Sequence, residues 1–60
     1  MRYRMIYYKN GEQFSYWSDD YARIFVRSLY LYNDCCCDVE IWEYTEQGSR
    51  LLERSLHHER

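Results

Sequence analysis

The 60-residue chain contains no proline, only two glycines and no long apolar run. A membrane-spanning helix needs about 20 consecutive apolar residues, so the sequence predicts none. Residues 1–4 (Met-Arg-Tyr-Arg) are also not followed by the apolar segment of a signal peptide. We therefore expect a cytoplasmic protein that makes no membrane contact.

The chain also lacks a strong excess of charge of either sign, with 8 Lys and Arg against 10 Asp and Glu and a net charge of −2. Its overall field is therefore too weak to draw it onto nucleic acid or an acidic membrane. Aromatic residues, by contrast, make up 20% of the chain, which is typical of a folded domain. At this length we expect one small domain over residues 1–60 with a single thin core, in which residues 55–60 lack an apolar pattern and form a frayed tail.

Motifs of catalysis are missing as well. The sequence has no glycine-rich phosphate loop and no His-Glu-x-x-His motif, and its two histidines are neighbours near the end. A fold of this size also has little room for an enclosed pocket of about 300 Å³ or more. We therefore expect a protein that is not an enzyme and that uses no cofactor.

Three cysteines occur together, Cys35-Cys36-Cys37. An odd, adjacent set is not the pattern of a secreted disulfide framework. Zinc requires about four ligands in tetrahedral geometry, and the CxxC spacing that supplies them is absent, although His57 and His58 complete the count on paper. The pattern favours one or two thiols packed at a helix–strand junction with the third exposed.

The first 17 residues have the pattern of a β-hairpin. Residues 2–9 alternate and are rich in strand-forming tyrosines, and residues 13–17 resume that pattern. Between them, Asn10-Gly11 is the pair best suited to the positive φ angles of a type I′ turn. The sequence therefore predicts two antiparallel strands.

A helix is predicted to follow, because Ser18 stands where an N-cap residue belongs and Asp19 and Asp20 place negative charge against the helix dipole. It should end near Asn33-Asp34, where asparagine tolerates the left-handed conformation that closes helices.

Projected at 100° per residue, the broadest apolar stripe of this helix is predicted to face the core. Arg23 and Arg27 fall on the opposite side, Ile24 and Leu31 on a flank away from the stripe, and Tyr30 on the back. The stripe consists of Tyr21, Ala22, Phe25, Val26, Leu29 and Tyr32.

Residues 38–45 and 50–54 are predicted to form a second hairpin around the turn residues 46–49. The fold class is therefore α+β in the order ββαββ, an antiparallel sheet with one amphipathic helix on one face. A single helix covers only one face of a sheet, so the other face meets water or a partner.

Two registers are open. If Tyr3, Met5, Tyr7, Val39 and Ile41 pack under the helix, the uncovered face carries Ile6, Tyr8, Trp42 and Tyr44; the opposite register exposes the other set. Exposed apolar patches mark interaction sites, and Tyr and Trp are enriched in binding hot spots. We therefore predict partner binding through Ile6, Tyr8, Trp42, Tyr44, Ile24, Arg27 and Leu31.

The sequence resembles short bacteriophage and prophage proteins, in which a strand ending in Tyr-Lys-Asn-Gly-Glu, a helix opening with Ser-Asp-Asp and an Ile-Trp-Glu-Tyr-Thr strand recur. Phage proteins of this size often bind a host protein, including antiviral-defence proteins. The resemblance implies a binder that inhibits or redirects a protein in the cytoplasm of a bacterial host.

The function predicted from the sequence is thus a non-catalytic protein-binding module that binds a partner or associates with itself as a homo-oligomer. The alternative is a small single-strand nucleic-acid-binding domain, because Arg2, Arg4 and Lys9 stand among tyrosines on which bases can stack. The negative net charge and Glu40 argue against that alternative.

Overall fold

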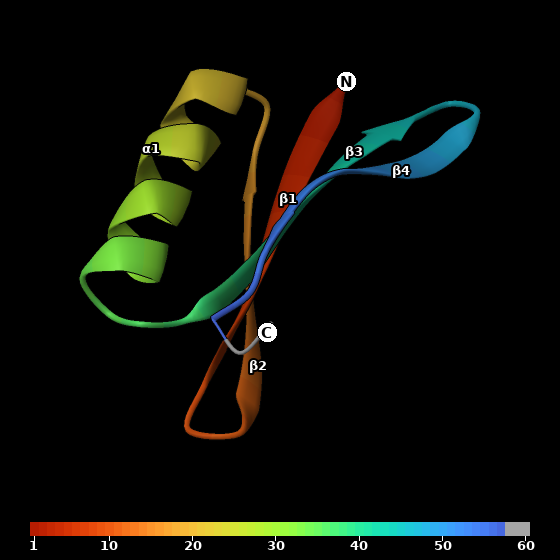
Figure 1. Ribbon diagram of the computed structural model, residues 1–60. Coiled ribbons are helices and arrows are strands. Elements are labelled where there is room, and N and C mark those ends of the chain that lie inside the picture. The colour runs from red at the N-terminus through yellow and green to blue at the C-terminus, as the bar shows by residue number, and fades with distance from the viewer. Residues whose placement is uncertain (58–60) are drawn as a thin grey trace.

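The computed structural model describes residues 1–57 as one four-stranded antiparallel sheet with a single helix packed across one face (Figure 1). The strand order is β2-β1-β3-β4, so β1 lies in the interior of the sheet. The predicted ββαββ arrangement and α+β class are confirmed. The elements are β1 (Arg2–Lys9), β2 (Glu12–Ser18), α1 (Tyr21–Asn33), β3 (Asp38–Thr45) and β4 (Gly48–Ser55).

The turn between β1 and β2 has the predicted chemistry. Asn10 and Gly11 have φ angles of 54° and 81°, the two positive values that a type I′ turn requires. Because β1 and β3 are antiparallel, the turn after β1 and the turn after β3 lie at opposite ends of the sheet (Figure 1). The pairing of β3 with β4 shifts register between Ile41 and Trp42, midway between the two hairpin tips.

The helix begins at a different cap from the one that the sequence predicts. Asp20 is the N-cap residue, and its Oδ1 accepts hydrogen bonds from the backbone N–H groups of Ala22 (3.1 Å) and Arg23 (3.4 Å). Ser18 instead accepts from the N–H of Asp20 at 3.0 Å. An aspartate caps as well as a serine and also brings a negative charge to the helix N-terminus, so the start is shifted by two residues.

The side of the helix that faces the sheet is rotated from the predicted stripe but overlaps it. Tyr21, Phe25 and Tyr32 of the stripe are half-buried and pack against the core, as predicted. Ile24 and Leu31, expected on an outer flank, are 0% and 8% exposed, whereas Val26 of the predicted stripe is 65% exposed. Ser28 lies between the two buried residues, and its hydroxyl donates to the carbonyl oxygen of Phe25 at 2.8 Å. Because this hydroxyl is satisfied within the helix, burying it costs little and the small side chain leaves room for close packing.

The chain leaves the helix through the cysteine segment. Asp34 caps the helix in the right-handed region, and the left-handed conformation that the sequence analysis assigned to this cap occurs instead at Cys36, with a φ angle of 58°. Cys37 is then buried beside Leu31, whose carbonyl oxygen accepts from the Cys37 N–H at 3.0 Å. The chain therefore enters the core at Cys37, and the first residues of β3 that face the helix, Val39 and Ile41, also belong to the core.

Residues 55–57, predicted to belong to a frayed tail, are held in place. Ser55 ends β4, and the carbonyl oxygen of Leu56 accepts a hydrogen bond from the Tyr32 hydroxyl at 3.2 Å. The His57 ring stacks on Tyr32 at 4.0 Å, and its backbone N–H donates to Asp38 Oδ1 at 3.0 Å. The rest of the predicted tail, residues 58–60, lies outside the described residues.

Candidate functional site: the open face of the sheet

The register of β1 decides which side chains the helix covers. Tyr3, Met5 and Tyr7 point toward the helix, as do Val39 and Ile41, so the first of the two registers is the one adopted. The buried core consists of Met5, Ile24, Leu31, Cys37, Val39 and Ile41.

Successive residues of a strand point to opposite faces, so the intervening residues line the uncovered side of the sheet. We call this side the open face. One row across it takes one residue from each strand and is set by the pairs Arg4↔Trp17, Arg4↔Trp42 and Trp42↔Leu51. The open face carries Arg2, Arg4, Ile6, Tyr8, Gln13, Ser15, Trp17, Asp38, Glu40, Trp42, Tyr44, Leu51 and Arg54.

One end of the open face holds a cluster of two cations and two aromatic rings. The guanidinium carbons of Arg2 and Arg4 lie 4.7 and 5.2 Å from the ring centroid of Trp17, and the Trp17 and Tyr44 rings are 5.0 Å apart. We call these four residues the arginine–aromatic cluster. The two rings come from strands on either side of β1, so they meet above the strand that supplies the arginines.

Arg4 is fixed within this cluster by hydrogen bonds to neutral groups. Its Nε–H and Nη2–H groups donate to Ser15 Oγ at 3.2 and 3.0 Å, and Nη1–H donates to the Tyr44 hydroxyl at 3.3 Å. Cation–π contacts of this kind stabilise by about 0.5–1 kcal/mol at exposed sites. The arginine therefore orders both rings before any partner arrives.

A second network lies beside the cluster. The indole Nε1–H of Trp42 donates to Glu40 Oε1 at 3.0 Å, and Arg54 Nε–H donates to the other carboxylate oxygen at 3.1 Å. Glu40 is thus paired with a cation and also sets the orientation of Trp42. Both tryptophans of the protein are held on the open face by polar contacts.

Ile6 lies at the middle of the open face but is only 9% exposed. Its cross-strand neighbours there are Ser15 and Glu40, and Arg4 and Tyr8 flank it along β1. Ile6 does not belong to the core cluster beneath the helix. It therefore forms a small separate apolar centre, screened by the larger side chains around it.

The outer surface of the helix is the other exposed apolar region. Val26, Leu29 and Tyr30 are 65%, 45% and 55% exposed, and Tyr30 lies on the back of the helix as predicted. The Arg27 guanidinium contacts the Tyr16 ring on β2 at 4.6 Å from its centroid. This surface also contains a shallow, open depression of about 590 Å³. It is lined by Asp20, Ala22, Arg23, Val26, Arg27 and Tyr30.

The structure separates the residues that the sequence predicts as one binding site. Ile6, Tyr8, Trp42 and Tyr44 share the open face, whereas Arg27 lies on the helix. Ile24 and Leu31 are corrections: both are core residues, because the helix is rotated relative to the predicted stripe, and they have no surface to offer a partner.

Sequence reasoning missed the most exposed tryptophan of the open face. Trp17, 41% exposed, lies in the predicted second strand, but the pairing that brings it beside Arg4 depends on the hairpin register. Counting back from the Asn10-Gly11 turn gives this register, since the pairs follow once Lys9 faces Glu12. The Asn10-Gly11 turn therefore already contained the information that places Trp17 opposite Arg4.

The cysteine segment matches its predicted arrangement, with Cys37 buried, Cys35 half-buried and Cys36 exposed. Burial raises the pKa of the Cys37 thiol, so this group stays protonated at neutral pH. Over residues 1–57 no group of three or more Cys, His, Asp or Glu side chains is arranged to hold a metal ion.

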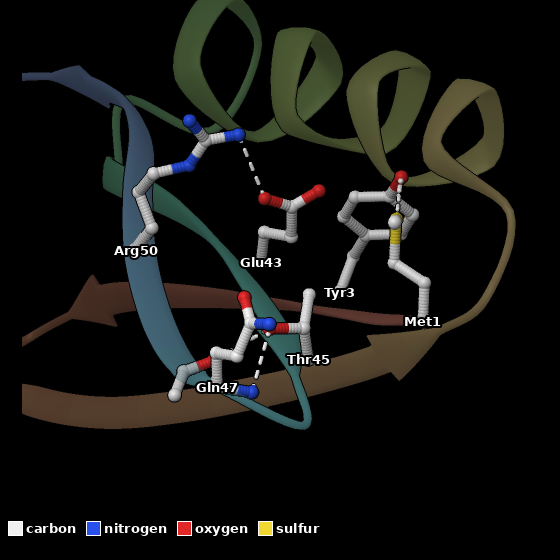
Figure 2. A network of polar contacts seen from close by, with 7 residues as sticks. Met1, Tyr3, Glu43, Thr45, Gln47 and Arg50 are labelled. Atoms are coloured by element: carbon white, nitrogen blue, oxygen red, sulfur yellow. Dashed lines mark hydrogen bonds and ion pairs between the residues drawn. The ribbon is translucent and has the colours of Figure 1, made fainter.

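The helix-covered side carries one exposed ion pair beyond the end of the core. Arg50 Nη2–H donates to Glu43 Oε1 at 2.8 Å between β4 and β3, on the side of the sheet that faces the helix (Figure 2). The same view shows Tyr3 donating to the sulfur of Met1, and Thr45 accepting from the backbone N–H of Gln47 in the turn after β3. These contacts close the rim of the core, and none reaches the open face.

No protein-family model matches the sequence, and no curated protein or solved structure gives a significant match. Within the described part of the chain, no helix combines the length and apolar character that crossing a bilayer demands.

Proposed function

We propose that this protein is a non-catalytic binding module that recognises another protein through the open face of its sheet. One observation carries the proposal: the only helix of residues 1–57 covers one side of the sheet, and the uncovered side concentrates Trp17, Trp42, Tyr44 and Tyr8. Tryptophan, tyrosine and arginine are the residues that most often dominate binding energy at protein interfaces.

The order of these side chains supports the proposal. Association is opposed by the entropy lost when mobile side chains become fixed, at about 0.5–1.5 kcal/mol for each flexible side chain. On the open face, Arg4 is already bonded to Ser15 and Tyr44, and Trp42 is already bonded to Glu40. A partner would therefore meet a surface that has lost much of this freedom on folding.

The resemblance to short phage proteins supports a bacterial host protein, such as one of antiviral defence, as the partner. Binding by a stoichiometric module would inhibit or redirect that protein by covering part of its surface. Cytoplasmic location is part of the same proposal. Self-association as a homodimer is the other way in which the open face could be used.

A small single-strand nucleic-acid-binding domain is the second candidate. The stacking of Arg2 and Arg4 on Trp17 favours it, because single-strand binders combine aromatic platforms for bases with cations for phosphates. Asp38 and Glu40 on the same face count against it, since they would repel a phosphate backbone that continued past the cluster.

The test is a capture experiment from bacterial lysate with four baits: the native chain, Trp42→Ser, Tyr44→Ser and the control Tyr30→Ser. Tyr30 is exposed on the outer helix surface, so its substitution removes the same atoms as Tyr44→Ser without touching the open face. We expect a protein that the native chain and Tyr30→Ser retain and that both open-face variants lose. Far-UV circular dichroism of each bait checks that the fold is kept.

Static light scattering over a concentration series identifies self-association. A dimer of the native chain that Trp42→Ser converts to a monomer would make a second copy the partner. The proposal is contradicted if all four baits capture the same proteins in equal amounts and also have the same molar mass in solution.

A further inference from the structure

We propose that the arginine–aromatic cluster (Arg2, Arg4, Trp17 and Tyr44) binds carboxylate groups, so that the partner presents an acidic segment to this end of the open face. This inference rests on the proposed protein-binding function and gives its partner a chemical class.

The charges of the cluster are uncompensated. Within residues 1–57, ion pairs are formed by Arg50 with Glu43 and by Arg54 with Glu40, and by neither Arg2 nor Arg4. The hydrogen bonds of Arg4 go to the neutral hydroxyls of Ser15 and Tyr44. The Arg2 guanidinium contacts the Trp17 ring and makes no hydrogen bond in this part of the chain.

The donors that remain suit a carboxylate. Arg2 retains all five of its N–H groups, and a guanidinium offers two of them in parallel to the two oxygens of one carboxylate. The Arg2 guanidinium carbon lies over the Trp17 ring at 4.7 Å from its centroid, a contact that uses none of these N–H groups and leaves them for such a pair. Arg4, anchored beside it, adds a second positive charge that raises the local potential for an anion.

Both arginines contact the Trp17 ring, so their two positive charges lie near each other. Like charges at close range repel each other, and a nearby anion offsets that repulsion. A bound carboxylate would relieve the repulsion that is present in the unbound protein. Anion binding is therefore favoured both by this relief and by the new hydrogen bonds. The aromatic rings at the same place offer apolar contact to the rest of the partner segment.

The distribution of charge favours an acidic protein segment over a nucleic acid. The cluster occupies one end of the open face, and the next charged groups along it are Glu40, paired with Arg54, and then Asp38. A short acidic segment needs only one cationic end, whereas a nucleic-acid strand carries a phosphate at every nucleotide and would continue onto these carboxylates.

The experiment is an NMR titration of the full chain with a hexaglutamate peptide at low salt, following the Nε–H signals of Arg2 and Arg4 and the indole signals of both tryptophans. We expect saturable shifts at Arg2, Arg4 and Trp17, and smaller ones at Trp42. Hexalysine serves as the peptide of opposite charge, and a single-stranded oligothymidylate of equal charge serves as the competing ligand.

A matched pair of variants separates a site from general charge. Arg2→Gln and Arg23→Gln each remove one positive charge from an exposed side chain that forms no ion pair among the described residues. We expect Arg2→Gln to weaken hexaglutamate binding about fivefold or more and Arg23→Gln to change it less than twofold. Neither arginine side chain donates a hydrogen bond within residues 1–57, so both variants should fold.

The inference is overturned if the two variants weaken binding equally, if hexaglutamate gives no saturable shifts, or if the oligothymidylate binds more tightly than the peptide. These results are distinguishable from failure of the proposed function. Suppose that capture of a partner protein needs Trp42 and Tyr44 but is unchanged in Arg2→Gln. The proposed protein-binding function would then stand, and only the inference that the partner presents an acidic segment would be wrong.

Discussion

The open face and the outer helix surface both expose apolar side chains, but they differ in how those side chains are held. On the open face, Trp17 contacts two guanidinium groups and a tyrosine ring, and Trp42 is bonded to Glu40. On the helix, Val26 and Leu29 are more exposed than Trp17. Judged by exposure alone, the outer helix surface would be the better candidate binding site. Judged by residue type and by how firmly the side chains are held, the open face is the better candidate.

The difference shows why exposed apolar area is an incomplete guide to function in a small domain. A 60-residue chain leaves much apolar surface uncovered in any case, because it has little interior. Side chains that are exposed and also fixed by specific contacts are a stronger indication, since the structure has already met part of the cost of binding. The predictions below test this distinction.

The largest effect is expected where the helix meets the sheet. Ile24→Ala should lower the free energy of unfolding by about 2–5 kcal/mol, because it removes a fully buried side chain from the core. That loss is comparable with the whole stability expected of so small a domain. Val26→Ala on the outer surface should change it by less than about 0.5 kcal/mol. Urea unfolding followed by circular dichroism measures both, and similar losses would mean that the helix packs with its other side inward.

The next largest effect concerns binding. Trp17→Ala should weaken the complex with the captured partner about thirtyfold, equivalent to about 2 kcal/mol, because the most exposed tryptophan of the open face would be lost. Leu29→Ala removes a side chain of nearly equal exposure from the helix and should weaken binding less than twofold. Isothermal titration calorimetry provides both affinities. A larger loss for Leu29→Ala would move the interface to the helix.

A smaller effect is expected from the residue that orders the open face. Arg4→Gln should reduce stability by about 1–2 kcal/mol, because hydrogen bonds to Ser15 and Tyr44 and a cation–π contact are lost. Arg23→Gln removes the same charge from the helix and should have almost no effect. Thermal unfolding compares the two. Equal stability of both variants would show that the polar network does not fix the open face.

The sequence predicted the strands and the first hairpin turn, because period-2 alternation and the Asn10-Gly11 pair are local signals, but it left open which of the two strand registers faces the helix. It was only partly right for the face of the helix, since Tyr21, Phe25 and Tyr32 of the predicted stripe pack against the core but Val26 and Leu29 do not. The stripe through Val26 is more apolar than the one through Ser28, and the pattern took no account of the hydrogen bond within the helix by which the Ser28 hydroxyl is satisfied at the Phe25 carbonyl oxygen. The arginine–aromatic cluster was missed because it joins three strands, whose side-by-side order follows from the fold and not from any one segment.

The smallest effect follows from the ionisation of Cys37. Its pKa is raised in the folded state by burial, so the thiol ionises more readily after unfolding. The stability from this group is complete below the ordinary thiol pKa of about 8.5 and is lost as the pH rises toward the folded-state value. Between pH 8 and 9.5 we expect a small loss of stability in the native chain, and a smaller loss in Cys37→Ala. A pH-independent native chain would contradict this assignment.

The central claim, that binding occurs through the open face, is tested most directly by mapping the complex by NMR. The partner retained by the native bait is added to isotopically labelled protein, and the signals that shift or broaden are assigned. The account predicts that the indole N–H signals of Trp17 and Trp42 and the ring signals of Tyr44 change most, while Val26, Leu29 and Tyr30 stay unperturbed. Perturbations confined to the outer helix residues, with both indoles unchanged, would contradict it.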